Sequence, residues 1–268
     1  NTSNVTNMAG LFKDVNSLTS LNVSGFNTSK VTDMSYMFTA MNSLTSLNVS
    51  TFNTSRVTNM AYMFAQTESL TSLNVSNFNT SNVTNMTGMF SEMTNLTSLN
   101  VSGFDTSNVT RMGCSAVTDI TPVSDDEATY SVNDVGMFSK MDSIQTLDLS
   151  SFDTSKVQIM GCMFANCDNL KTIYASNKWS TQAVTYGHIM FVNDKKLVGG
   201  SGTTHIESIY KWDSSSIYES DEDWYKAGLQ IASSQDEVLN QMYSLMGYSY
   251  NPLDSVIDDR SEEHTSEL

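Results

Sequence analysis

The sequence has few basic residues, few cysteines and almost no proline. Its 268 residues include 13 Lys and Arg against 29 Asp and Glu, so the formal net charge is -16 at pH 7. A nucleic-acid groove needs clustered Lys and Arg to neutralise phosphates, so we expect no nucleic-acid partner. No stretch approaches the roughly 18 consecutive apolar residues that a membrane-spanning helix needs, so we expect no membrane span within this sequence. Three cysteines without C-x-x-C spacing are too few for a disulfide scaffold.

Asn, Ser, Thr and Met are abundant instead, and they recur with a period of 26 residues. The period is marked by a phenylalanine followed by N/D-T-S-x-V-T-x-M, at Phe26, Phe52, Phe78 and Phe104. Phe152 comes 48 residues after Phe104, and the 22 extra residues indicate an insertion at 115–136. Because repeats of this length form solenoids, the period decides the fold class.

Each unit contains a helix-like pattern followed by a strand-like pattern. Met34, Met37, Phe38 and Met41 fall at i, i+3, i+4 and i+7, which predicts one face of a short helix. Residues 46–50 then alternate polar and aliphatic, which predicts a short strand with Leu and Val inward and Ser and Asn outward. A single unit buries too little apolar surface to offset the entropy of ordering it, so units must stack. The sequence therefore predicts a parallel α/β solenoid with one strand and one helix per coil, about six coils and a degenerate seventh.

Fifteen of the 17 methionines form three columns of equivalent positions. Core packing is the favoured interpretation, and a Met-rich binding groove is the alternative. The columns are Met8, Met34, Met60, Met86, Met112 and Met160; Met37, Met63, Met89, Met137, Met163 and Met190; and Met41, Met93 and Met141.

We expect the solenoid to cover residues 1–203, followed by a cap or linker at 204–259. Ser234 and Glu237 have capping-box spacing ahead of an apolar stripe, which predicts a helix near 235–246. The last nine residues, 260–268, read RSEEHTSEL and match the translation of a common sequencing adapter. We interpret them as an artefact.

The run FNTSKVTDMSYMFTAMNSLTSLNVSTF, its copies, and the closing LKTIYASNKW with LVGGSGT resemble the BspA-like leucine-rich-repeat surface proteins of bacteria. The resemblance covers residues 1 to about 203, and the chain departs from it in the insertion and after Thr204. It implies a right-handed, leucine-rich-repeat-like solenoid, an extracellular location at the bacterial cell surface, and adhesion to host or bacterial surfaces. It supplies no catalytic residues and implies no cofactor.

The outward face of the predicted strands is the candidate binding site. It is a flat, uncharged array of hydroxyls and amides, and a solvated sheet without a partner is the alternative. The array lacks an aromatic platform for a sugar ring, and its near-identical units favour a repetitive partner. The candidate residues are Ser20, Asn22, Ser46, Asn48, Ser72, Asn74, Ser98, Asn100 and Asp148.

Other patterns have a functional and a structural interpretation. The threonine column is typical of ice-ordering arrays, but turn hydroxyls that bond the backbone are favoured. Acidic runs could gather Ca²⁺, but neither run has EF-hand spacing, so solvated loops are favoured and no metal site is assigned. Cys114 and Cys162 occupy equivalent positions, where buried free thiols are favoured over a disulfide. The threonines are Thr28, Thr54, Thr80, Thr106 and Thr154, and the acidic candidates are Asp125, Asp126, Glu127, Asp221 and Asp223.

Catalysis has little support, because neither His188 nor His205 belongs to a recognisable nucleophile arrangement. The leading hypothesis is a non-enzymatic bacterial surface adhesin that binds a host extracellular or bacterial surface protein or glycan, with no cofactor. The alternative is a passive spacer that projects another domain from the cell.

Overall fold

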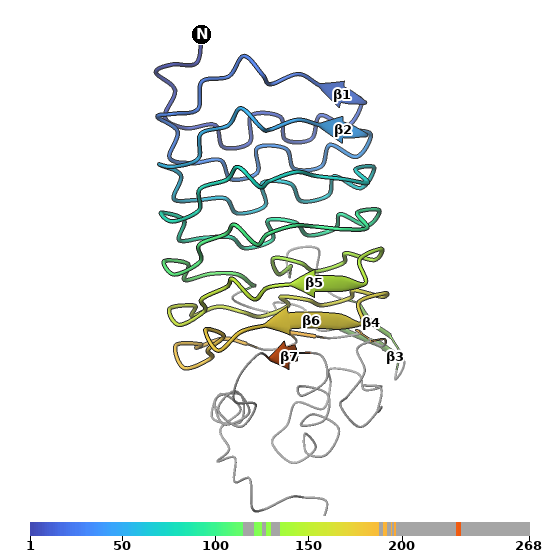
Figure 1. Ribbon diagram of the computed structural model, residues 1–268. Helices are drawn as coiled ribbons and strands as arrows, with labels where there is room; N and C mark the ends of the chain where they lie inside the picture. The colour runs from blue at the N-terminus through green and yellow to red at the C-terminus, as the bar shows by residue number, and fades with distance from the viewer. Residues whose placement is uncertain are drawn as a thin grey trace, which may run out of the picture.

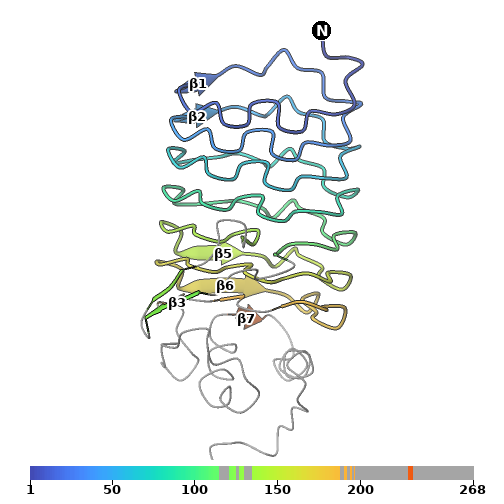
Figure 2. The same cartoon turned by 180° about the vertical axis from the view of Figure 1, so that it is seen from behind.

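The chain winds into a stack of similar coils, with the N-terminus at one end of the stack (Figure 1). The view from behind shows the same layering on the opposite side (Figure 2). The computed structural model describes residues 1–114, 121–124, 127–129, 135–187, 190–191, 194, 196 and 229–231. The predicted repeat solenoid is therefore present in this part of the chain.

Short parallel strands join some neighbouring coils in register, and the prediction of one strand per coil holds only in part, because the equivalent segments 72–76 and 98–102 contain no strand. In the N-terminal coils β1 (Ser20–Leu21) pairs with β2 (Ser46–Leu47). In the C-terminal coils β5 (Thr146–Asp148) pairs with β6 (Thr172–Ala175), and β6 pairs on its other side with β7 (Leu229–Ile231). The register joins residues one repeat apart, such as Ser20 with Ser46, because the 26-residue period brings equivalent positions together.

A second parallel ladder runs along the whole stack on another side of the coil. It consists of isolated bridges, each joining equivalent residues of neighbouring coils. The bridged residues are Asn7, Asp33, Asn59, Asn85, Arg111, Ile159 and Tyr186. Every rung connects one coil to the next, so backbone hydrogen bonds between coils accompany the turn bonds within each coil.

The prediction of one helix per coil is wrong for the described residues, which contain no helix. In the 34–41 segment, the N–H of Met34 donates to the carbonyl of Asn59 at 3.0 Å, and that of Phe38 donates to Met63 at 2.9 Å. An α-helix would direct these N–H groups to carbonyls four residues back in their own segment. The segment is instead a chain of turns that bonds the next coil.

Two left-handed residues in this segment prevent a helix from propagating. Tyr36 and Ala40 both have φ 57°, and the equivalent residues of other coils, such as Tyr62 and Gln66, do the same. An L-residue in this conformation ends a right-handed helix. The methionines nevertheless face the core, because the turns place them on the same side as a helix would.

Asparagine and aspartate close the turns of each coil. At up to three places per coil a side-chain oxygen accepts the backbone N–H two residues later, at 2.7–3.1 Å. This Asx turn explains why the repeat needs so many short polar side chains. The acceptors are Asn22, Asn48, Asn74, Asn100 and Asp148; Asn27, Asn53, Asn79, Asp105 and Asp153; and Asn7, Asp33, Asn59 and Asn85.

The core is filled by columns of methionine and phenylalanine. All fifteen methionines of the three columns are at most 4% exposed, which confirms core packing. One column of phenylalanines stacks ring on ring from coil to coil, with centroids 5.1–6.0 Å apart. Its members are Phe12, Phe38, Phe64, Phe90, Phe138, Phe164 and Phe191. The stacked rings extend the hydrophobic contact through the whole solenoid.

A disulfide joins Cys114 and Cys162 in neighbouring coils, with their Cα atoms 5.9 Å apart. The favoured interpretation of free thiols is therefore wrong for this pair, because stacking brings the equivalent positions within bonding distance. Cys167 is a buried free thiol, as expected. The coil that contains Cys114 continues at Met137, whose N–H donates to the carbonyl of Met112 at 2.7 Å.

Between these points β3 (Thr121–Ser124) and β4 (Glu127–Thr129) form an antiparallel hairpin beside the C-terminal coils (Figures 1 and 2). The segments predicted at 204–259 and 260–268, including the helix near 235–246, lie outside the described residues except for β7. That strand extends the parallel ladder beyond β6, with Tyr174 opposite Gln230.

Candidate functional site

The predicted binding residues lie together on one side of the solenoid. All nine are exposed: Ser20, Asn22, Ser46, Asn48, Ser72, Asn74, Ser98, Asn100 and Asp148. The parallel register places the serines in one column and the asparagines in a second column. We call this surface the strand face.

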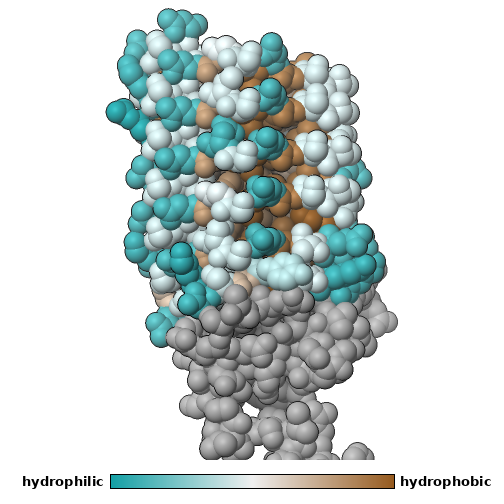
Figure 3. All heavy atoms as spheres, viewed as in Figure 1, coloured by the Kyte–Doolittle hydropathy of each residue, from teal (hydrophilic) through white to brown (hydrophobic). Residues whose placement is uncertain are grey.

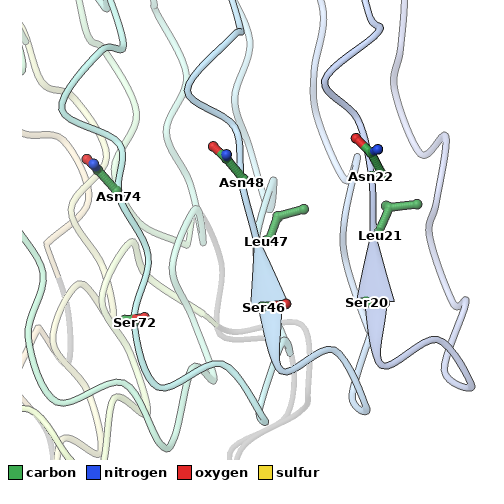
Figure 4. Close-up of a pocket in the computed structure, with 8 residues that line it drawn as sticks. All are labelled: Ser20, Leu21, Asn22, Ser46, Leu47, Asn48, Ser72 and Asn74. Carbon is green, nitrogen blue, oxygen red and sulfur yellow. The ribbon is translucent and has the colours of Figure 1, made fainter.

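The strand face is hollowed by an open pocket of about 460 Å³ that crosses the first three coils. Figure 4 shows the serines and asparagines of successive coils in rows, with leucines between them. An apolar band runs along the stack beside a hydrophilic column, with residues of intermediate hydropathy on its other side (Figure 3). The lining residues are Ser20, Leu21, Asn22, Ser46, Leu47, Asn48, Ser72 and Asn74.

The leucine floor is a feature that the sequence pattern did not predict. The alternation places the leucines inward, and Leu147 in a later coil is indeed fully buried. Leu21 and Leu47 are only half-buried and line the pocket, so they present apolar surface between the two polar columns. The strand face is therefore amphipathic rather than uniformly polar.

In each asparagine of the strand face, the Oδ1 atom supports the fold and the Nδ2 group is available to a partner. The Oδ1 atom of Asn48 accepts the N–H of Ser50 at 3.0 Å, which fixes the side chain beside the pocket. Its Nδ2 makes no hydrogen bond within the described part of the chain, and the same holds for Asn22, Asn74 and Asn100. An amide carries two N–H donors on this nitrogen, so Asn22, Asn48 and Asn74 present fixed donor groups to the pocket, and Asn100 presents one on the next coil of the strand face.

The serine column is also available for binding. No described residue forms a hydrogen bond with the hydroxyls of Ser20, Ser46, Ser72 or Ser98, each of which can donate and accept. In the C-terminal coils threonine takes this position, at Thr146 and Thr172. The hydroxyl column thus continues along the stack.

One carboxylate enters the asparagine column, at Asp148. Hydrogen bonds from the side chain and then the backbone N–H of Ser150 lower the pKa of Asp148 below its usual value. This aspartate makes the same turn as the asparagines, so the turn requires only the oxygen acceptor. The next residue of the column is Tyr174, which lies opposite Asp148 in the β5–β6 register and is 42% exposed.

The threonine column has a different role from the strand face. The hydroxyl of Thr80, which is 1% exposed, donates to the carbonyl of Asp105 at 2.9 Å and accepts its N–H at 2.8 Å. Thr54 makes the same pair of bonds with Asn79. These hydroxyls join neighbouring coils, which confirms the backbone-bonding interpretation and leaves no exposed threonine array in this column.

The acidic candidates are not brought together by the described structure. Asp125, Asp126, Asp221 and Asp223 lie outside the described residues, and Glu127 begins β4, of which only the backbone is described. Among the residues that the structure describes, no group of three or more His, Cys, Asp or Glu side chains is placed to hold a metal. In the same residues no helix has the length and apolar character to cross a membrane.

The fold and the strand face define a repeat protein with stacked, near-identical coils. The chain belongs to the family described as Mycoplasma protein of unknown function, DUF285, whose model matches residues 1–72, 38–115 and 130–228. The matches omit 116–129, where the chain departs from the coil pattern. No curated protein and no solved structure matches the chain significantly.

Proposed function

We propose that this chain is a non-enzymatic adhesin of the bacterial cell surface that binds macromolecules through the strand face. The observation that carries the proposal is the pair of polar columns, one of serine hydroxyls and one of asparagine Nδ2 groups, that face solvent on both sides of an apolar floor. The threonine hydroxyls on another side of the coil are instead engaged in bonds between coils. The strand face therefore offers fixed polar groups to a partner.

The proposed location is extracellular. The Cys114–Cys162 disulfide supports it, because disulfides persist mainly in oxidising environments. The resemblance to BspA-like leucine-rich-repeat surface proteins, with their right-handed solenoids, supports the same location and the adhesive role. Membership of a family described from Mycoplasma is compatible with a bacterial source.

A passive spacer is the second candidate, favoured by the rod-like build of the stack. Ladders of backbone bonds and the stacked phenylalanines connect each coil to the next, so the solenoid resists bending. A spacer needs no binding surface, which makes the two functions separable by experiment.

We propose no enzymatic role and no cofactor. Cys167, the free thiol in the described residues, is fully buried, and burial followed by the nearby Asp194 raises its pKa well above the usual value. A buried thiol of raised pKa is a poor nucleophile. His188 and His205 lie outside the described residues.

The binding proposal is tested by applying the labelled chain to an array of host matrix proteins, bacterial surface proteins and glycans. The double variant Ser46→Arg, Ser72→Arg places bulky charges in the pocket at hydroxyls that make no bond within the described structure. We expect it to weaken capture by about tenfold or more, a loss of about 1.4 kcal/mol.

The control is Asn82→Arg, Asn108→Arg, which adds the same charge in a column that already holds Lys30, Arg56 and Lys156. It removes the Nδ2 bonds to the carbonyls of Ser55 and Ser81, so circular dichroism checks that it folds as the parent chain does. It should bind as the parent chain does. Absence of any captured partner, or equal capture by the Ser46→Arg, Ser72→Arg variant, would favour the spacer.

A further inference from the structure

We propose that the partner of the strand face is a neutral polysaccharide that lies along the solenoid axis. This inference rests on the proposed binding function and names the chemical class of its ligand. It follows from three properties of the face: absence of charge, alternation of polar and apolar columns, and repetition.

The strand face of the first four coils carries no ionisable side chain. The outward residues of 20–24, 46–50, 72–76 and 98–102 are serine and asparagine throughout. A sulfated or carboxylated glycan would need Lys or Arg to compensate its charge during desolvation. The surface is therefore suited to an uncharged partner, because an ionic ligand would lose its hydration here without an opposite charge to compensate it.

The alternation of columns matches the two kinds of surface on a sugar ring. A hexose presents hydroxyls at its rim, which donate and accept hydrogen bonds, and C–H groups on its faces, which are apolar. The serine hydroxyls and the asparagine Nδ2 donors can bond the rim, while Leu21 and Leu47 contact the C–H face. A few placed polar groups over an apolar floor are typical of small-molecule and sugar sites.

Tyr174 supplies an aromatic ring at the C-terminal end of the asparagine column. Its position follows Asp148 by one rung of the β5–β6 register, and the side chain is 42% exposed. An exposed aromatic with an apolar face and a polar tip suits stacking against a sugar ring at a wet surface. The candidate residues named from the sequence end at Asp148, one coil before this tyrosine.

Repetition makes a polymer the preferred ligand. Hydrogen-bonded coils place equivalent strand positions about 4.8 Å apart, so the same donors recur along the axis. Each set of contacts is exposed to water and weak, but linked sugar units engage successive coils with a high effective concentration. A polysaccharide should bind much more tightly than its free monosaccharide.

The test uses the double variant Asn48→Asp, Asn74→Asp in the full chain. Aspartate keeps the oxygen that accepts the turn N–H, as Asp148 does naturally at this position, but it lacks the N–H donors and adds charge. The matched control is Asn53→Asp, Asn79→Asp, at a column where Asp105 and Asp153 occur naturally. Both variants change the net charge equally, and circular dichroism checks that both fold.

Affinity electrophoresis measures retardation of the chain in gels containing dextran, a galactomannan, a β-glucan, hyaluronan or heparin. We expect at least one neutral polysaccharide to retard the parent chain and the control, and the Asn48→Asp, Asn74→Asp variant to bind it about tenfold or more weakly. The free monosaccharide should compete poorly with the polysaccharide. The variant Tyr174→Ala should also bind the polysaccharide more weakly than the parent chain does.

Three results would overturn the inference: no retardation by any neutral polysaccharide, retardation by the anionic ones alone, or equal retardation of both double variants. Capture of a protein through the strand face, without any glycan binding, would also refute it while leaving the proposed adhesive function intact. Absence of both glycan binding and protein binding would refute the polysaccharide inference and the adhesive function together.

Discussion

At the scale of single residues, side chains that are chemically alike have different roles because of where the coil places them. The hydroxyl of Ser46 faces the pocket, whereas that of Thr80 is buried and bonds the next coil. The asparagines combine both roles, with Oδ1 closing a turn and Nδ2 facing solvent. Composition alone cannot separate these roles, since each depends on a neighbour in another coil.

Replacing Thr80 by valine tests the role of the buried threonine column. Thr80→Val keeps the shape but leaves the N–H and carbonyl of Asp105 without their hydroxyl partner. We expect a loss of about 2–3 kcal/mol in the free energy of unfolding, because buried polar groups without partners are costly. Urea denaturation measures it, and Thr80→Ser, which keeps the hydroxyl, should lose less; equal stability of the two variants would refute the role.

Asp142 is expected to make the solenoid less stable at neutral than at acidic pH. Burial, followed by the charges of Asp168 and Glu92, raises its pKa to about 6, with Lys140 acting in the opposite direction. Between pH 3.8 and about pH 6 the folded state therefore holds a proton that the unfolded state has released. The stability that this proton contributes is full below about pH 4 and is lost as the pH rises through 6.

The variant Asp142→Asn removes this titration and tests the effect. We expect the fall in Tm between pH 4 and pH 7 to shrink by about 2–4 °C, for a contribution of about 1 kcal/mol after allowance for partial exposure. Thermal unfolding followed by circular dichroism provides the comparison. The same fall in the variant and the parent chain would contradict the assignment.

At the scale of elements, the turn segment 34–41 shows what the sequence could and could not predict. The spacing of Met34, Met37 and Phe38 identified the side chains that reach the core, and all three are fully buried. The same spacing predicts a helix, although a chain of turns with left-handed residues produces it too. Periodicity reports which side chains are inward, but it does not reveal that the N–H groups bond another coil.

Exposure of all nine candidate residues of the strand face could be predicted, because a two-residue alternation fixes which side chains point outward. The partial exposure of Leu21 and Leu47 could not be predicted, since the depth of a side chain depends on how neighbouring coils pack. Tyr174 could have been found by continuing the 26-residue register from Asp148. The disulfide depended on spatial proximity and on compartment, and the sequence left both open.

Glycine substitution distinguishes the turn segment from a helix. In a helix Ala→Gly costs about 1 kcal/mol, but Ala40 has φ 57°, a conformation that glycine adopts without strain. We expect Ala40→Gly to be neutral or stabilising, and Ala65→Gly, at a buried position one residue before the left-handed Gln66, to be destabilising by about 1 kcal/mol. Urea denaturation compares the two; a similar loss in both variants would favour the helix.

At the scale of the whole molecule, stability is distributed along a one-dimensional stack. Each coil contacts only its neighbours, so a crosslink between adjacent coils stabilises the region around it. The Cys114–Cys162 disulfide joins neighbouring coils across a sequence separation of 48 residues. It ties the coil that carries the insertion to the coil that follows it.

Removal of this crosslink should lower stability. A closed loop of this size corresponds to a loss of up to about 4 kcal/mol in the chain-entropy model. We expect Cys114→Ser, Cys162→Ser to unfold at lower urea concentration, and a reducing agent to affect the parent chain but not the variant. Equal midpoints for the oxidised parent and the variant would show that the disulfide contributes nothing.

The strand face is also a property of the whole molecule, because the pocket exists only where several coils are in register. The most direct test records the side-chain amide NMR signals of the asparagines while the neutral polysaccharide that binds best is added. The account predicts that the signals of Asn22, Asn48, Asn74 and Asn100 shift together and that those of Asn27, Asn53 and Asn79 do not. Shifts confined to the second set, or no shifts despite binding, would contradict the strand face as the binding surface.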